Sequence, residues 1–256
     1  MEGNQKFHRA RIVQRRDIAA DLWSIRVQPG AEFHFLPGQY ATLGVMTPAK
    51  HIERPYSIVS SPYEPEVEFF FELVPRGELT PALYKLQVGD ELTMRKVAKG
   101  RFTLEREVRN HLLLCTVTGV APFVSYLRTL SSDARENKFP EGHRLFLLEG
   151  ASRSWEFGYL GELKGIAEEV PWFKYVPTVS RPWEDPKWEG EVGRVDDLIR
   201  KYIDSWGLTP ETTSCYLCGH PKMIETSHGI LARRGWAKEH IKEEIYFVPK
   251  EHATVI

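Results

Sequence analysis

The stretch Arg54-Pro55-Tyr56-Ser57 places a fixed cation and an aromatic ring two residues apart. In an extended strand side chains alternate, so Arg54 and Tyr56 share one face while Pro55 and Ser57 take the other. Such a face suits a ligand with a pyrophosphate at one end and a flat ring at the other. Because Pro55 cannot donate to a strand ladder, we expect this strand at an edge or opening. The alternative is a surface strand with an ordinary Arg and a core Tyr.

A second candidate is the loop Thr118-Gly119-Val120-Ala121-Pro122, which directly follows the apolar run 111–117. Gly119 permits a close backbone approach, and the following helix offers free N–H groups and a positive dipole end to a pyrophosphate. The glycine spacing Gly-x-Gly-x-x-Gly is absent, so the strict dinucleotide fingerprint is not met. A plain strand–turn–helix joint remains the alternative for this loop.

The elements that carry the first stretch are short strands. Alternating runs separated by turn residues predict strands at 8–13, 22–27, 40–45, around Tyr56, at 67–73 and at 91–94. A short helix is predicted at 79–86, with Thr80 as its N-cap and Pro81 at its first position. Many short strands with little helix predict a small closed antiparallel β-barrel.

The second half changes rhythm near Asn110, where strands and helices begin to alternate. Strands are predicted at 111–117, 145–148, 175–179, 215–218 and, last, 245–248, with helices at 123–130, 159–169, from Val195 and from Pro221. This alternation predicts a doubly wound parallel sheet. The expected fold class is therefore β followed by α/β, with a barrel domain at 1–105 and an α/β domain at 106–256.

Taken together, the motifs resemble one family in order along nearly the whole chain. They are Pro37-Gly38-Gln39-Tyr40, Arg54-Pro55-Tyr56-Ser57, Gly77-Glu78-Leu79-Thr80, Val88-Gly89-Asp90, Val117 to Phe123 and Leu217-Cys218-Gly219-His220-Pro221. This set is similar to that of the ferredoxin/flavodoxin–NADP reductases, bacterial type. The resemblance implies an FAD-binding barrel and an NADP-binding domain with the flavin between them. It also implies hydride exchange between NADPH and FAD, and single-electron exchange between FAD and ferredoxin or flavodoxin.

The same resemblance implies roles for individual residues. Arg54 and Pro55 would lie at the FAD phosphate, Tyr56 against the isoalloxazine ring and Ser57 near its N5 edge. Tyr56, Ser57 and Cys218 are the catalytic candidates. The remaining residues expected to contact FAD are Phe71, Leu73, Val74, Gly77, Leu79 and Thr80. Those expected to flank the nicotinamide are Thr118, Cys218 and Gly219, and Gly119 is expected to bind the nucleotide through its loop.

Selection of NADP requires cations near the ribose 2′-phosphate, where an NAD enzyme places a carboxylate. Arg153, Ser180-Arg181 and Arg194 match the phosphate-reading positions of the family, although solvated loop arginines are the alternative interpretation. The intervening loop 182–191 is longer and more acidic than the family pattern. Its carboxylates could weaken phosphate binding.

The C-terminal tail follows the predicted last strand and begins at Pro249. By resemblance to the bacterial relatives it crosses the flavin face, with His252 near the position of an aromatic residue. A frayed terminus is the alternative.

Composition narrows the function classes. The chain has 256 residues and a formal charge of −1, with 42% hydrophobic and 27% charged residues. This charge argues against a general role in binding nucleic acid. We see no export signal and no apolar run of membrane-spanning length, so we expect a cytoplasmic protein. Cys215 and Cys218 spell Cys-x-x-Cys, but residues three apart on a strand face opposite ways, which argues against a dithiol or metal pair.

A basic cluster at the end of the barrel comprises Arg95, Lys96, Lys99 and Arg101, with Lys85 nearby in sequence. Complementary charge speeds and orients encounters, so the cluster is a candidate docking surface for an acidic electron carrier. An ordinary solvated strand and turn is the alternative. The other functions left open are an NAD(P)H:flavin or quinone reductase on the same fold and a non-catalytic flavin redox sensor.

Overall fold

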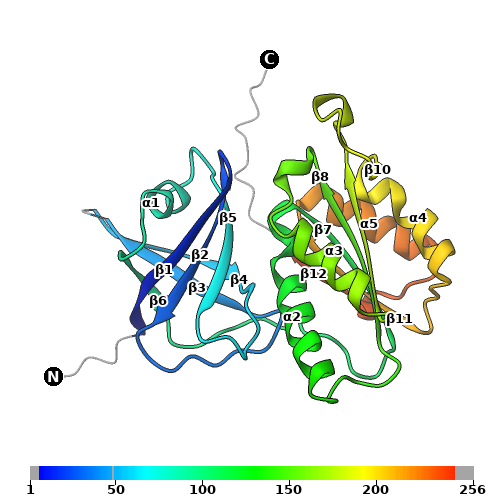
Figure 1. Cartoon of the computed structure of the whole chain (residues 1–256), viewed down its shortest axis with the longest axis horizontal. Helices are drawn as coiled ribbons and strands as arrows, with labels where there is room; N and C mark the ends of the chain where they lie inside the picture. The colour runs from blue at the N-terminus through cyan, green and yellow to red at the C-terminus, as the bar shows by residue number, and fades with distance from the viewer. Residues whose placement is uncertain (1–5, 48, 246–256) are drawn as a thin grey trace.

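The computed structural model describes residues 6–47 and 49–245. Two units lie side by side, a β-barrel in the N-terminal half and an α/β unit in the C-terminal half (Figure 1). The barrel strands are β1 (Phe7–Ala19), β2 (Leu22–Pro29), β3 (Tyr40–Met46), β4 (His51–Ser57), β5 (Val67–Glu72) and β6 (Glu91–Arg95), with the short helix α1 (Thr80–Tyr84) between β5 and β6.

The barrel is a six-stranded sheet with the order β4-β3-β6-β1-β2-β5, in which all pairs are antiparallel. A bridge between Ile58 and Phe69 joins the segment after β4 to β5, so the sheet closes on itself. Alternate residues point inward, where Trp23 stacks on Phe71 with ring centroids 5.2 Å apart. The predicted antiparallel barrel is confirmed.

The α/β unit contains a six-stranded sheet with the order β10-β9-β8-β7-β11-β12, in which all pairs are parallel. Its strands are β7 (Asn110–Thr116), β8 (Arg144–Ala151), β9 (Phe173–Val179), β10 (Glu191–Val192), β11 (Thr213–Gly219) and β12 (Ile241–Ile245). The strand order reverses at β7, with β8 on one side and β11 on the other. In such sheets ligands bind beyond the carboxyl ends of the strands at this switch point.

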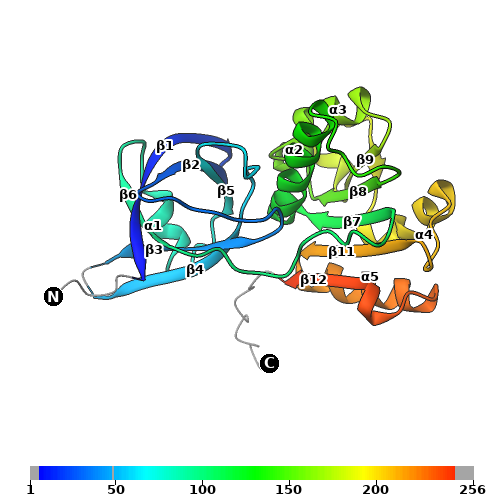
Figure 2. The same ribbon diagram turned by 90° about the horizontal axis from the view of Figure 1, so that it is seen from below.

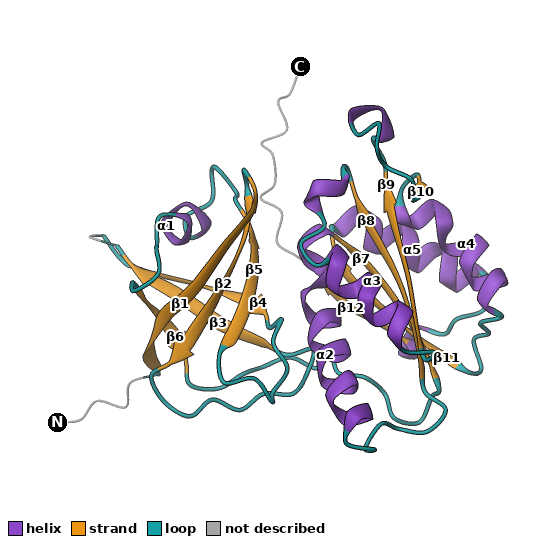
Figure 3. Cartoon of the chain, in the orientation of Figure 1, coloured by secondary structure: helices purple, strands orange, loops and turns teal. Residues whose placement is uncertain are grey.

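Helices cover both faces of the parallel sheet, as Figures 2 and 3 show. They are α2 (Ala121–Arg135), α3 (Leu160–Glu169), α4 (Val195–Trp206) and α5 (Pro221–Arg233), together with the 3₁₀ turns η1 (Val117–Val120), η2 (Ser154–Glu156), η3 (Pro182–Glu184) and η4 (Lys238–His240). Phe123 of α2 and Leu163 of α3 pack on one face, and Ile199 of α4 and Leu231 of α5 pack on the other. The predicted doubly wound sheet is confirmed. None of the described helices is long and apolar enough to span a bilayer.

Two local predictions differ from the structure. Thr80 does not cap α1; it is the first helical residue, and Leu79 occupies the cap position. The Thr80 hydroxyl instead bonds back to the preceding turn, accepting from the Val74 amide at 3.0 Å. Strand β12 covers Ile241–Ile245, so it begins four residues before the predicted strand 245–248, of which residues 246–248 lie outside the described ranges. Because β12 is an edge strand, its polar sequence lacks the apolar run used to predict it.

The two cysteines of Cys-x-x-Cys face opposite sides of the parallel sheet, as their spacing predicts. Cys215 packs in the core under α4 and α5, and Cys218 packs in the core under α2 and α3. The neighbour of Cys218 is instead Cys115, which is its register partner on β7.

Glu149 of β8 is a fully buried carboxyl in this sheet. Tyr175 donates a hydrogen bond of 2.5 Å to its Oε2, and Cys115 is its register partner on β7. Burial raises the pKa of Glu149 to about 8, although the bond from Tyr175 acts in the opposite direction. Between pH 4.5 and 8, Glu149 is therefore protonated in the native state and ionised in the unfolded chain.

Replacing Glu149 with Gln is expected to flatten the pH dependence of stability. Because the folded pKa is raised, wild-type stability is greatest below the unfolded pKa and falls as the pH rises through the folded value. The variant keeps an acceptor for Tyr175 but has no proton to lose. Urea unfolding at pH 5 should give similar free energies, and at pH 8.5 the variant should be more stable, by on the order of 3 kcal/mol. Parallel curves for the two proteins across this range would contradict the assignment.

Candidate functional site

The barrel and the α/β unit enclose a cavity of about 830 Å³ between them. This volume lies in the range of small-molecule and cofactor sites. The walls from the barrel are Arg54 to Ser57, Phe70 to Pro75 and Gly77 to Thr80; those from the α/β unit are Thr116 to Thr118, Gly150 to Ser152, Ser180, Arg194 to Asp196, His220, Lys222, Met223, Glu244 and Ile245. The fold thus brings the two stretches first identified from the sequence to one place.

The strand β4 supplies the first wall. It is an edge strand of the sheet order, as Pro55 predicts. The Arg54 guanidinium is half-exposed and donates to the carbonyl of Glu53 at 2.7 Å and to Glu78 Oε2 at 3.4 Å. Tyr56 packs edge-on against Phe71 of β5, with ring centroids 4.8 Å apart. A cation and two aromatic rings therefore line one side of the cavity.

Ser57 lies at the carboxyl end of β4 with 6% of its surface exposed. Its buried hydroxyl has no hydrogen-bond partner among residues 6–47 and 49–245. Buried hydroxyls are normally paired, so an unpaired one beside a cavity indicates that a ligand atom completes its bonding.

The turn between β5 and α1 supplies the second wall. The Thr80 hydroxyl ties α1 to the backbone of Val74, and the amide of Gly77 donates to the carbonyl of Val74 at 2.8 Å. Leu73, Val74, Gly77, Leu79 and Thr80 all line the cavity, as does Phe71. The carboxylate of Glu78 pairs with Lys50 at 2.5 Å as well as with Arg54.

The nucleotide loop follows β7 at the switch point of the parallel sheet. A Cβ on Gly119 would collide with the carbonyl oxygen of Cys218 and would lie 2.8 Å from its carbonyl carbon. Gly219, at the end of β11, has φ +128°. Val117 has φ +44°, a left-handed conformation that costs a β-branched residue roughly 1–3 kcal/mol. Such strain concentrates at functional loops, where the surrounding structure holds it in place.

The structure places the nicotinamide candidates differently with respect to the cavity. Thr118 lines it, whereas Cys218 is fully buried on the α2 and α3 side of the sheet and does not. Gly119 and Gly219 do not line it either; Gly119 lies against the backbone of Cys218 and Gly219. His252 lies outside the described residues.

Carboxylates accompany all three candidate phosphate-reading arginines. Glu184 of η3 pairs with Arg153 and also lies 3.6 Å from Arg181. Arg153 further contacts Glu156 at 3.1 Å, and Arg194 contacts Asp196 at 3.2 Å. Ser180 and Arg194 line the cavity, whereas Arg153 and Arg181 lie on the loops beyond its wall.

Glu244 is a cavity residue that sequence reasoning missed. It lies on β12 as the register partner of Cys218. Burial raises its pKa to about 7. His220 and Lys222, at the start of α5, also line the cavity, and the His220 amide donates to the Thr116 hydroxyl at 3.0 Å. Nothing in the short run 241–245 identifies Glu244 as a cavity residue from the sequence. Only the parallel pairing of β12 with β11 places it there.

These features fit FAD. The cavity offers two aromatic side chains, an unpaired buried hydroxyl, a guanidinium and a turn with an exposed backbone, which match an isoalloxazine ring and a pyrophosphate. The second half of the cavity lies at the switch point of a parallel sheet, where dinucleotides bind. The arrangement can hold a flavin and a nicotinamide on facing walls.

Comparisons with known proteins agree with this geometry. The family model for an oxidoreductase FAD-binding domain matches residues 9–103, and that for an oxidoreductase NAD-binding domain matches residues 113–229. Ferredoxin–NADP reductase of Pseudomonas aeruginosa is 30% identical over 226 residues, which cover 82% of this chain and 83% of the relative. The electron transfer component XylA of the Pseudomonas putida xylene/toluene monooxygenase is 28% identical, covering 90% of this chain and 63% of the relative.

Among solved structures, a ferredoxin NADP⁺ reductase from Neisseria gonorrhoeae with bound FAD and NADP has a TM-score of 0.83 and 26% sequence identity. The match covers 95% of this chain and all of that one, 100%. The barrel, the doubly wound sheet and the cavity between them thus occur in one arrangement that both sequence and structure match. The chain belongs to the ferredoxin–NADP reductase family and is an oxidoreductase built from an FAD-binding and an NAD-binding domain.

Proposed function

We propose that this protein is an FAD-dependent reductase that takes a hydride from NADPH and delivers electrons singly to ferredoxin or flavodoxin. The observation that carries the proposal is that the Arg54 to Ser57 strand and the Thr118 loop line the same cavity. We place the domain boundary between residues 105 and 106, in the segment that connects β6 to β7.

In this proposal the side chains bind, orient and exclude water. Arg54 and the Gly77 turn hold the FAD pyrophosphate, and Tyr56 supports the flavin ring. The Ser57 hydroxyl bonds the edge of the ring. Bound FAD supplies the two-electron to one-electron conversion that the protein's own side chains cannot perform.

The nucleotide half of the cavity receives NADPH. Thr118 and Gly119 shape the nicotinamide pocket, with Cys218 and Gly219 behind them. Arg153, Ser180, Arg181 and Arg194 read the 2′-phosphate at the carboxyl ends of β8, β9 and β10. This arrangement follows the general rule that cations near the ribose select NADP over NAD.

The electron carrier docks on a basic surface of the barrel. Lys96, Lys99 and Arg101 are exposed, whereas Arg95 bonds Glu53 at 3.0 Å and is partly buried. Neutralisation by Glu53 leaves Lys96, Lys99 and Arg101 as the effective cluster. Such charges mainly raise the rate of encounter with an acidic partner.

An anaerobic titration tests this function. The purified protein should be yellow, NADPH should bleach its absorbance, and subsequent addition of ferredoxin or flavodoxin should restore the oxidised spectrum. Bleaching without transfer to either carrier would favour a flavin or quinone reductase. Colourless protein that takes up no FAD would contradict the proposal.

Replacing Arg181 with Ala is expected to raise the KM for NADPH by about ten-fold or more and to leave the KM for NADH nearly unchanged. A charge-assisted contact to the 2′-phosphate is worth about 1.5–3 kcal/mol, and only NADPH carries that phosphate. Steady-state kinetics with both nucleotides measure the two constants. Equal increases would show that Arg181 does not read the phosphate.

Replacing Glu184 with Gln is expected to act in the opposite direction to Arg181→Ala. Its carboxylate contacts both Arg153 and Arg181, so it competes with a 2′-phosphate for the same guanidinium groups. Removing its charge should lower the KM for NADPH by about two- to ten-fold, with little effect on NADH, since exposed pairs contribute about 0.2–1 kcal/mol each. Glu136→Gln, which affects only the surface pair with Lys138 away from the cavity, is the matched control. An unchanged ratio of the two KM values would contradict this competition.

A further inference from the structure

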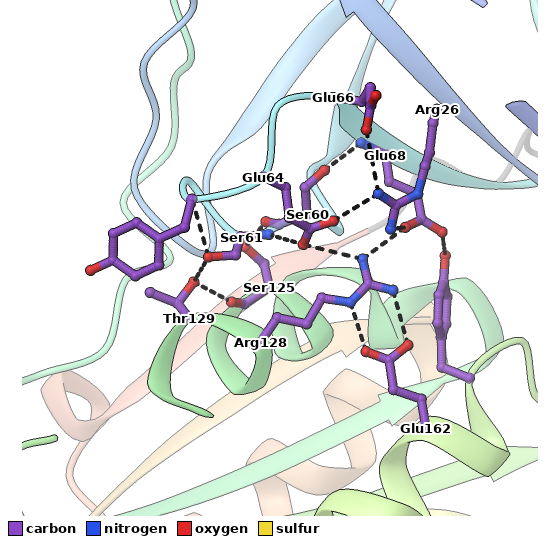
Figure 4. A network of polar contacts seen from close by, with 12 residues as sticks. Arg26, Ser60, Ser61, Glu64, Glu66, Glu68, Ser125, Arg128, Thr129 and Glu162 are labelled. Carbon is purple, nitrogen blue, oxygen red and sulfur yellow. Dashed lines mark hydrogen bonds and ion pairs between the residues drawn. The ribbon is translucent and has the colours of Figure 1, made fainter. Parts of the chain in front are cut away.

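A network of polar contacts joins the barrel to the α/β domain away from the cavity (Figure 4). Its centre is Arg128 of α2. The guanidinium makes a forked contact with Glu162 of α3, with Nε to Oε1 at 2.7 Å and Nη2 to Oε2 at 2.9 Å. Its third nitrogen, Nη1, donates to Glu68 Oε2 of β5 at 2.7 Å. One side chain thus binds a carboxylate from each domain.

Glu68 is the barrel partner, and its side chain is 5% exposed. Its carboxylate also accepts from Arg26 at 2.9 Å and from the Tyr159 hydroxyl at 2.8 Å. Burial alone would raise the pKa of Glu68, but the bonds and charges of Arg128, Tyr159 and Arg26 outweigh it and hold the pKa below its ordinary value. The carboxylate is therefore ionised, and its contacts define its position.

Other polar side chains on the same face of α2 also bond the barrel. The Ser125 hydroxyl donates to the carbonyl of Ser60 at 2.6 Å, and the Thr129 hydroxyl donates to Ser61 Oγ at 3.0 Å. Ser125, Arg128 and Thr129 are three and four residues apart, so they form one stripe on the helix. Glu64, in the segment between β4 and β5, also joins the network, with contacts to Arg26 at 2.9 Å and to Arg128 at 3.5 Å.

The network connects α2 and β5, the two elements that lead directly into opposite walls of the cavity. Helix α2 begins at Ala121, directly after the η1 loop that carries Thr118, and Arg128 lies about two turns along it, roughly 10 Å from its start. Strand β5 carries Glu68 and continues into Phe70 and Phe71, which line the flavin side. None of Arg128, Glu162 and Glu68 lines the cavity itself.

Apolar contacts alone would hold the domains together without fixing their orientation. Phe70 of the barrel packs edge-on against Tyr159 at 5.4 Å, within a core that also includes Leu22 and Val59. Such contacts are non-directional. The fork with Glu162, within the α/β domain, instead holds the Arg128 guanidinium in one orientation, and its Nη1 then meets Glu68 of the barrel in only one relative position of the domains. Buried ion pairs are often no more stabilising than apolar residues of the same volume, so their main contribution here is orientation.

We infer that Arg128 is a positioning residue that fixes α2 against β5 and thereby sets the distance between the flavin-binding wall and the nicotinamide loop. The inference rests on the proposed hydride transfer from NADPH to FAD. Hydride transfer requires the reacting atoms at about 3–3.5 Å, and a misplacement of 1 Å can cost about 100-fold in rate. Loosening the network should therefore slow the transfer while both cofactors still bind.

The test replaces Arg128 with Lys in the FAD-loaded protein. Lys keeps the charge but cannot reproduce the planar fork. Stopped-flow reduction at saturating NADPH should slow by about ten-fold or more, while FAD content and the Kd for the nucleotide stay within about two-fold. Glu162→Gln should act in the same direction. Arg234→Lys is the matched control, because Arg234 pairs with Asp204 entirely within the α/β domain, and it should leave the rate unchanged.

An unchanged reduction rate in both Arg128→Lys and Glu162→Gln would overturn the inference, as would a rate loss matched by equal losses in FAD and nucleotide binding. If Arg128→Lys does not fold, Tyr159→Phe removes one bond to Glu68 and leaves every ion pair intact. It should slow reduction by a smaller factor with FAD retained, and a wild-type rate would count against the inference.

A second measurement does not depend on hydride transfer, so it distinguishes failure of this inference from failure of the proposed function. Spin labels on Val88→Cys in the barrel and Lys164→Cys on α3 report the distance between the domains. The three native cysteines are buried and should not label. Arg128→Lys should broaden this distance distribution relative to wild type, and superimposable distributions would overturn the inference even in a protein that NADPH does not reduce.

Discussion

Replacing Arg54 with Ala is expected to weaken FAD binding by about ten- to a hundred-fold, because a charge-assisted contact to a phosphate is worth about 1.5–3 kcal/mol. The fold should not suffer. The Arg54 side chain is half-exposed, and its protein contacts are a backbone carbonyl and the surface carboxylate of Glu78. The loss should therefore appear in retention of the cofactor rather than in the midpoint of unfolding of the apoprotein.

Fluorescence titration of the apoproteins with FAD measures this effect. Arg9→Ala is the matched control, since Arg9 also lies on the barrel and pairs with one carboxylate, Glu91, at 2.9 Å, but its side chain is 82% exposed and away from the cavity. Equal affinities for FAD in wild type and in Arg54→Ala would remove Arg54 from the phosphate site. A loss of affinity in both variants would indicate a general effect of surface charge.

Replacing Gly119 with Ala is expected to lower kcat/KM for NADPH by about 100-fold. The added Cβ would meet the backbone carbonyl of Cys218, and backbone atoms of β11 cannot rotate away as a side chain can. The loop must therefore shift, and it carries Thr118 on the cavity wall. A displacement of about 1 Å at a reacting centre is enough for an effect of this size.

The control is Gly161→Ala on α3, where an added Cβ meets no atom within 4 Å. In a helix this change should leave the kinetics unchanged and stabilise slightly, because Ala has the higher helix propensity. FAD content should remain normal in both variants, since Gly119 belongs to the nucleotide half. Gly119→Ala with wild-type kcat/KM would show that the close backbone contact does not shape the nicotinamide pocket.

The sequence alone determined the fold class and the main walls of the site. Arg54 and Tyr56 share one face because they are two residues apart on a strand. The hydrophobic pattern changes from short alternating runs to strand–helix units near Asn110. Both are local patterns that a chain segment carries by itself. The position of β4 at a sheet edge follows from one residue, Pro55. The divergence of Cys215 and Cys218 follows from strand geometry in the same way.

The tertiary structure decided what lies beside these elements. Glu244 became a wall of the cavity because β12 pairs with β11 in a register that no local pattern specifies. Thr80 bonds Val74 rather than capping α1, since the preceding turn brings that backbone within reach. In both cases the deciding contact joins segments whose relative placement depends on the folded chain.

The long-range ion pairs show this most clearly. Arg181 and Glu184 belong to the loop after β9, and Glu184 reaches Arg153 because that loop meets the loop after β8 at the carboxyl edge of the sheet. Arg128 bonds Glu68 across 60 residues of sequence, and an isolated α2 would present it only as a charged helix residue. Local periodicity sets which face a side chain takes. The partner on that face is set by the packing of distant segments, which no single segment encodes.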